Sequence, residues 1–256
     1  MRLFDTHAHL NQIEDIAGAL KRAREAEVDK ILIAGLDLNS NKKVIEIYNN
    51  TNDFNLYLAL GIHPYKPEKD TFNEIYALIE KYKDTIIAIG EIGLDYTYKE
   101  AKEKGPGRDL QIEAFKSQLA LAKKLDKPVI VHSRAAWNDC FEMVEEYGLS
   151  KVLFHWYTGP LDILESILRK GYYISVSPAI EYSKQAQAAA LHTPENRILL
   201  ETDSPVRYRP PSGSYICEPK DVIRTLEKLS ELKKIDKEEL AKITYISSCS
   251  FFNITD

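Results

Sequence analysis

The opening segment "DTHAHL" places two histidines in a stretch whose apolar neighbours predict a buried strand. His7 and His9 are two residues apart, and alternate side chains of an extended chain point to the same face. Asp5 shares that face one step earlier. Imidazole nitrogens and carboxylate oxygens are ligands that Zn²⁺, Mn²⁺ and related divalent ions take. By themselves the two histidines are only a modest indication of a metal site.

The same residue types recur at the carboxyl ends of later apolar segments. These residues are His63, Glu91, His132, His155 and Asp203. Five of the six histidines therefore lie where a predicted strand ends, and only His192 lies in a helical stretch. Random placement would scatter them, so the pattern indicates a shared site.

Short apolar runs alternate with longer helical patterns about eight times along the chain. The predicted strands span residues 2–10, 30–36, 56–64, 86–95, 128–134, 151–157, 172–178 and 197–205. Such alternation predicts parallel strands joined by helices. Eight units in 256 residues favour a single-domain α/β protein, a (β/α)₈ TIM barrel over residues 1–256. An open doubly wound sheet is the alternative, but it more often has a glycine-rich loop after its first strand, and "THAHLNQ" has no glycine.

In such a barrel the carboxyl ends of all strands open onto one face, so the polar residues should converge there. Unpaired buried charges are costly, and bound cations would balance them. The candidate ligands are His7, His9, Glu91, His132, His155 and Asp203. Six ligands exceed what one tetrahedral ion takes, which suggests two divalent ions. Glu91 is the predicted bridge, because Gly90 and Gly93 beside it permit close backbone approach.

Composition limits the partners that we expect. With 34 basic and 39 acidic residues the net charge is −5, so no global basic field attracts nucleic acid, and a local site would have to hold it. Cys140, Cys217 and Cys249 are far apart and form no C-x-x-C motif, which predicts reduced thiols. Neither a signal peptide nor a membrane-spanning run is evident. We therefore expect a cytoplasmic protein with no membrane partner and no obligate protein partner.

The ordered motifs "DTHAHL", "GIHP", "AIGEIGLDY", "PVIVHSR", "FHWYTG" and "ETDSP" resemble those of the TatD family of metal-dependent hydrolases, which belongs to the wider amidohydrolase-type barrels. This resemblance runs from about residue 3 to the carboxyl terminus. It implies that His7 and His9 bind one ion with Asp203 beside it, and that Glu91 links this ion to a second. It places the second ion on His132 and His155, and it places His63 near a substrate phosphate.

Family members are known as 3′→5′ exodeoxyribonucleases, so the expected activity is cleavage of phosphodiester bonds at single-stranded DNA ends with two divalent ions (Zn²⁺, Mn²⁺ or Mg²⁺). We expect Asp203 to orient the attacking water and take its proton. His63, with Arg134 or Arg207, is expected to hold phosphate oxygens. Trp156 and Tyr157 directly follow a proposed ligand and are predicted to stack on a terminal base.

Two departures from the family pattern affect the expected substrate. Trp156-Tyr157-Thr158 stands where Cys-Phe-Ser is usual, and "PSGSYICEP" replaces a basic stretch whose charge Arg207 and Arg209 would partly supply. One alternative is therefore a D-aminoacyl-tRNA deacylase, or another ester or amide hydrolase, on the same metal site. A second alternative is a non-enzymatic barrel that keeps metal for folding or binding. Six candidate ligands argue against it, because structural zinc sites are usually closed with four.

Overall fold

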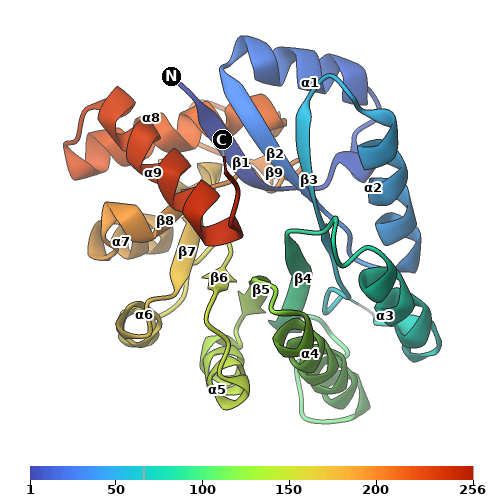
Figure 1. Ribbon diagram of the computed structural model, residues 1–256. Helices are drawn as coiled ribbons and strands as arrows, with labels where there is room; N and C mark the ends of the chain where they lie inside the picture. The colour runs from blue at the N-terminus through green and yellow to red at the C-terminus, as the bar shows by residue number, and fades with distance from the viewer. Residues whose placement is uncertain (66, 256) are drawn as a thin grey trace.

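The computed structural model describes residues 1–65 and 67–255, and its centre is an eight-stranded parallel sheet (Figure 1). The strands follow one another around the sheet in chain order. They are β1 (Leu3–Ala8), β2 (Val28–Ala34), β3 (Asn55–Leu60), β4 (Ala88–Asp95), β5 (Val129–Arg134), β6 (Val152–Phe154), β7 (Tyr173–Val176) and β8 (Ile198–Leu200). This order confirms the predicted α/β barrel.

Hydrogen bonds between β1 and the residues around the end of β8 bring the two edges of the sheet together. The Thr6 hydroxyl donates to the carbonyl oxygen of Leu200 over 2.9 Å. The amide of His9 donates to the carbonyl of Ser204 over 2.8 Å. The ring is therefore nearly closed, and the alternative of an open sheet is wrong.

The helices cover the outside of this ring, as Figure 1 shows. They are α1 (Ile16–Glu25), α2 (Leu38–Asn50), α3 (Phe72–Lys81), α4 (Pro106–Leu125), α5 (Trp137–Tyr147), α6 (Leu161–Arg169), α7 (Lys184–His192), α8 (Val222–Lys233) and α9 (Lys237–Phe252). A short hairpin of β9 (Arg207–Tyr208) and β10 (Tyr215–Ile216) follows β8. Among the helices of residues 1–65 and 67–255, none is long and apolar enough to cross a membrane.

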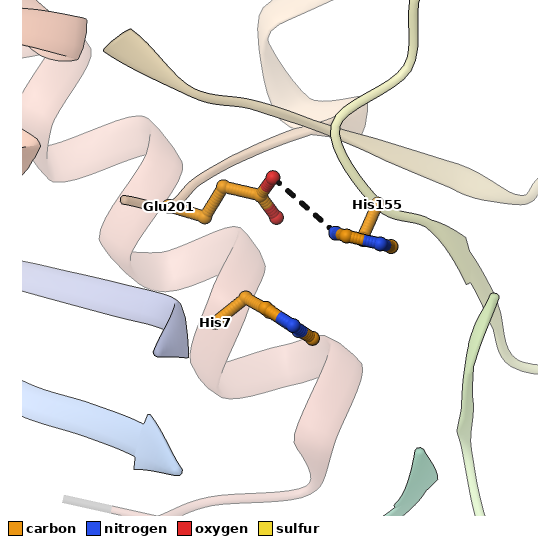
Figure 2. Close-up of side chains that lie close together, drawn as sticks. All are labelled: His7, His155 and Glu201. Carbon is orange, nitrogen blue, oxygen red and sulfur yellow. Dashed lines mark ion pairs between the residues drawn. The ribbon is translucent and has the colours of Figure 1, made fainter. Parts of the chain in front are cut away.

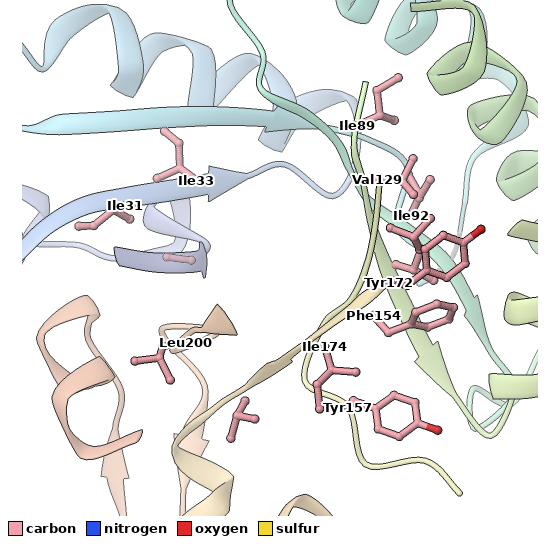
Figure 3. Close-up of a cluster of buried hydrophobic side chains, with 14 of the residues drawn as sticks. Ile31, Ile33, Ile89, Ile92, Val129, Phe154, Tyr157, Tyr172, Ile174 and Leu200 are labelled. Carbon is pink, nitrogen blue, oxygen red and sulfur yellow. The ribbon is translucent and has the colours of Figure 1, made fainter. Parts of the chain in front are cut away.

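The continuous apolar strands are explained by burial on both faces. In β2, Ile31 and Ile33 pack outward into the layer between sheet and helices (Figure 3), whereas Leu32 and Ala34 belong to a separate cluster with Phe4. Because successive side chains alternate, a strand with helices on one side and barrel interior on the other is apolar at most positions.

Helix α9 covers the end of the barrel at which the strands begin. The ring of Phe252 lies 5.8 Å from that of Phe4, and Tyr245 bonds to Asp29 and Lys30 at the start of β2. A break near Ile235 separates α8 from α9. With this end covered, the opposite end, where the strands terminate, is left to form a pocket.

Candidate metal centre

A pocket of about 380 Å³ opens at the carboxyl ends of the strands. His7 is the penultimate residue of β1, and His9 is the first residue after this strand. Glu91 lies within β4 and His132 within β5. His155 directly follows β6, and His63 and Asp203 each lie three residues beyond their strands. The structure thus brings together residues that are distributed over most of the chain.

Glu91 lies at the centre of this cluster, and its two oxygens face different histidines. Oε2 lies 3.2 Å from Nε2 of His7 and 3.4 Å from Nε2 of His9. Oε1 lies 2.7 Å both from Nδ1 of His132 and from Nε2 of His155. One carboxylate therefore joins two groups of nitrogen donors.

The backbone beside Glu91 needs glycine to allow this arrangement. Gly93 pairs with His132 across β4 and β5 and has a φ angle of +145°. A Cβ atom there would lie 1.9 Å from the carbonyl oxygen of His132. The predicted close approach beside Glu91 is confirmed at this position.

Asp203 completes the group formed by His7 and His9. Its Oδ1 lies 3.2 Å from Nε2 of His9 and 3.6 Å from Nε2 of His7. Its φ angle is +52°, a left-handed conformation that aspartate tolerates better than most residues. The Asp203 amide donates to the carbonyl of His7, which fixes this turn against β1.

Three of the four central histidines have an acceptor at the ring nitrogen that faces away from the cluster. Nδ1 of His9 lies 3.0 Å from the carbonyl oxygen of Ala34. Nε2 of His132 lies 2.9 Å from Oδ2 of Asp95, and Nδ1 of His155 lies 3.5 Å from Oε1 of Glu201. Histidines that bind metals usually have such a partner, because it fixes the tautomer and the ring orientation.

Asp95 and Glu201 were not singled out from the sequence, although both are fully buried. The available signal was even spacing: Asp95 lies four residues after Glu91 on β4, and Glu201 lies two residues before Asp203. Residues at even spacing on a strand share a face, so both were candidates for this end of the barrel.

The electrostatics of the cluster favour cation binding. Burial raises the pKa of Glu91, but the neighbouring histidines His155, His63 and His7 outweigh this and hold it well below its usual value. Burial lowers the pKa of His9, yet hydrogen bonds with Asp203 and Glu91 raise it to about 10. Glu91 is thus anionic, and positive charge is stabilised beside it. Together with the mixed nitrogen and oxygen donors, this fits divalent ions that accept both.

His63 differs from the other histidines of the cluster. The amide of Tyr65 donates to its Nδ1 over 2.9 Å, so the proton of the neutral ring is on Nε2. Nε2 lies 3.4 Å from Oε1 of Glu91. Burial lowers the pKa of His63, which favours this neutral form.

The predicted substrate-binding residues lie in different places. Arg134 and Trp156 line the pocket. Arg207 is exposed on β9 and does not line the pocket.

The stacking role predicted for Tyr157 is wrong. Its side chain is buried in the core, and its hydroxyl donates to the carbonyl oxygen of Pro160 over 2.7 Å. Trp156, in contrast, has a left-handed φ angle of +41° and its ring packs 5.5 Å from that of Tyr208 at the pocket wall. Adjacent residues after β6 thus point in different directions, and only the first can meet a ligand.

An α/β barrel with a histidine and carboxylate cluster at the carboxyl ends of its strands is the architecture of a metal-dependent hydrolase. Comparison with known families places this chain: it belongs to the family of TatD related DNases, which matches residues 4–253. The resemblance noted in the sequence is therefore confirmed.

Individual relatives match almost the full chain. An uncharacterized metal-dependent hydrolase, YabD of Bacillus subtilis, is 32% identical, and the match covers 98% of this chain and 99% of the relative. The deoxyribonuclease TATDN3 of Homo sapiens is 31% identical, covering 98% and 94%. Among solved structures, the TatD homologue YJJV from Escherichia coli superposes with a TM-score of 0.89 at 27% identity, with 99% of both chains covered.

Proposed function

We propose that this metal-dependent hydrolase is a 3′→5′ exodeoxyribonuclease that acts on single-stranded DNA ends. The observation that carries the proposal is the position of Glu91, whose two oxygens face two separate donor groups. Two-metal sites of this kind are common in nucleases and phosphatases. The relatives named deoxyribonuclease support DNA as the substrate.

In this proposal His7, His9 and Asp203 hold one divalent ion, His132 and His155 hold the other, and Glu91 joins them. When bound, such ions supply activated water at neutral pH and offset charge on phosphate oxygens. The histidine-rich ligands favour Zn²⁺ or Mn²⁺ in binding, and Mg²⁺ is the third candidate.

Asp203 is the proposed group that orients the attacking water and accepts its proton. Its side chain is 11% exposed, compared with 3% for that of Glu91, so Asp203 is the more accessible of these two carboxylates. The water oxygen bonds to phosphorus while the bond from phosphorus to the leaving sugar oxygen breaks. The carboxylate of Asp203 takes the proton from water, and the leaving oxygen takes one from solvent.

His63 and Arg134 are the proposed phosphate-binding residues. Because Nδ1 of His63 accepts from the Tyr65 amide, Nε2 carries the proton and can donate to a phosphate oxygen. Arg134 is exposed at the pocket rim, where its guanidinium can bind a second oxygen.

Trp156 is the proposed stacking surface for the terminal base, since it lines the pocket. A pocket of about 380 Å³ is at the small end of ligand sites, which suits a strand end. We also propose a cytoplasmic location, supported by three buried cysteines that form no disulfide.

The test compares a 3′-labelled single-stranded DNA with a D-aminoacyl-tRNA on the same metal-loaded preparation. We expect release of 5′-mononucleotides that stops with chelator and resumes when the ion is restored. Glu91→Ala should lower this rate by more than about 100-fold, whereas Glu142→Gln, at an exposed position of α5, should not.

Two results would overturn the proposal. Preferential deacylation of the tRNA would assign the site to carboxylic esters. A DNA-cleavage rate of Glu91→Ala equal to that of the wild type, at matched metal content, would show that the cluster is not catalytic.

A further inference from the structure

Glu201 is a fully buried carboxylate that directly follows β8. Figure 2 shows it directed at the ring of His155, with His7 beside the pair. Oε1 of Glu201 and Nδ1 of His155 are 3.5 Å apart, and neither atom has a hydrogen-bond partner among the described residues. A buried carboxylate oxygen and a buried ring nitrogen that are both without a hydrogen-bond partner, and that lie 3.5 Å apart, indicate a specific pair.

The other oxygen of Glu201 receives a hydrogen bond from the hydroxyl of Ser175, a fully buried residue of β7. The Ser175 hydroxyl in turn accepts from the backbone amide of Trp156 over 3.1 Å. Because an amide can only donate and a hydroxyl has one proton, the direction of this chain is fixed. Oε2 of Glu201 is therefore an acceptor, and Oε1 is the oxygen directed at His155.

Trp156 has a backbone conformation that needs such support. Its φ angle of +41° is uncommon for residues other than glycine. The amide of the next residue, Tyr157, also donates to Ser175, at the carbonyl oxygen over 3.1 Å. Ser175 thus holds the turn that directs Trp156 to the pocket wall and Tyr157 into the core.

We propose that Glu201 is a positioning residue with two arms. The first arm accepts the Nδ1 proton of His155, which directs Nε2 toward Glu91 and the cation. The second arm acts through Ser175 and holds Trp156 where a base would stack. The inference rests on the proposed function in taking His155 as a metal ligand and Trp156 as a base-binding residue, but its readouts need no DNA.

The two arms can be separated by substitution. Glu201→Ala removes both arms, and Ser175→Ala removes only the second. Thr225→Val is the matched control, because the Thr225 hydroxyl is buried and donates to the backbone carbonyl of Glu201, leaving the carboxylate intact.

The first readout is the affinity of metal-stripped protein for Zn²⁺, measured by competition with a chromophoric chelator. Loss of a carboxylate behind a metal-binding histidine typically weakens binding about 10–100-fold, and we expect this for Glu201→Ala. Ser175→Ala and Thr225→Val should stay within about twofold, since both retain that carboxylate. In ¹⁵N-histidine spectra of the zinc-loaded protein, the protected Nδ1 proton of His155 should persist in Ser175→Ala and disappear in Glu201→Ala.

The second readout is the fluorescence of Trp156 in a Trp137→Phe background, which leaves it as the only tryptophan. Its emission should shift in Ser175→Ala and in Glu201→Ala, but not in Thr225→Val. Wild-type zinc affinity in a folded Glu201→Ala protein would overturn the first arm, and unchanged emission in Ser175→Ala would overturn the second.

Glu201→Gln keeps the test decisive if the alanine variant does not fold. An amide offers one acceptor oxygen and one donor nitrogen, so it can serve one arm but not both. If Glu201→Gln shows both the zinc affinity and the Trp156 emission of the wild type, the proposal is overturned. If zinc affinity falls as expected while the wild type cleaves no DNA, the positioning role stands and the nuclease proposal fails.

Discussion

Nε2 of His132 lies 2.9 Å from Oδ2 of Asp95, and this carboxylate is fully buried. The opposite nitrogen of the same ring lies 2.7 Å from Glu91. The pair thus repeats, at the same Oε1 atom of Glu91, the relationship between His155 and Glu201, with the two ring nitrogens exchanged. Two central histidines therefore each lie between Glu91 and a second carboxylate.

Replacing Asp95 with asparagine should weaken metal binding because the amide offers His132 a weaker acceptor without charge. We expect a loss of about 10–100-fold in Zn²⁺ affinity. Thr97→Val is the control, since Thr97 bonds to the other oxygen of Asp95. Equal affinities of Asp95→Asn and wild type would show that this carboxylate does not act on the ion through His132.

Truncation of Trp156 to alanine should weaken binding of a terminal base. Stacking is worth about 1–3 kcal/mol per base, so KM for single-stranded DNA should rise about 5–150-fold with little change in kcat. The matched substrate has an abasic nucleotide at its 3′ end and has no base to stack there. If Trp156→Ala loses as much activity on the abasic substrate as on intact DNA, the Trp156 ring stabilises its loop and does not bind the terminal base.

Substitution of Gly93 tests the close approach of β4 to β5. Both Gly93 and Gly213 have positive φ angles, of +145° and +124°, but a Cβ at Gly213 would meet nothing within 4 Å. Gly93→Ala should therefore lower the free energy of unfolding by about 1–3 kcal/mol more than Gly213→Ala, because of the clash with His132. Denaturant titration of both variants measures this difference, and equal losses would contradict it.

Stability at acid pH should depend on Asp29, which lies far from the pocket. Burial raises its pKa, but hydrogen bonds from Tyr245, Lys30 and Arg2 outweigh this and lower the pKa to about 2. Its contribution is thus fully present above about pH 4 and is lost as pH falls through about 2. After allowance for partial exposure of Asp29, we expect Asp29→Asn to lower the free energy of unfolding by about 1–2 kcal/mol near pH 5 and by progressively less toward pH 2.

Urea unfolding at several pH values checks this prediction. Asp70→Asn, at an exposed position, serves as the control. A stability difference between wild type and Asp29→Asn that stays constant from pH 5 to pH 2 would contradict the assigned cause.

The sequence predicted the architecture and the central cluster well, because both depend on short-range patterns. Alternating strands and helices predict the barrel, and the barrel places every strand end on one face. The residue types at those ends then identify His7, Glu91 and Asp203 without knowledge of their distances. Even spacing on β1 also correctly placed His7 and His9 together.

What the sequence could not supply was the direction of side chains beyond the strands. Asp95 and Glu201 had suitable spacing, but whether each reaches a histidine depends on the local bend of the chain. Tyr157 was mispredicted because the left-handed turn at Trp156 rotates the next residue into the core. Arg207 has an exposed side chain on β9 and does not line the pocket, a placement that depends on the hairpin after β8.

Because β1 is hydrogen-bonded to the residues after β8, a bound cation would also stabilise the closure of the barrel. His7 and His9 belong to the first edge of the ring and Asp203 to the last, and backbone hydrogen bonds join these edges. An ion held by all three would act as a clasp over the seam of the cylinder. Withdrawing it would loosen the seam before the rest, and backbone amides at that junction would exchange with solvent ahead of those in neighbouring strands.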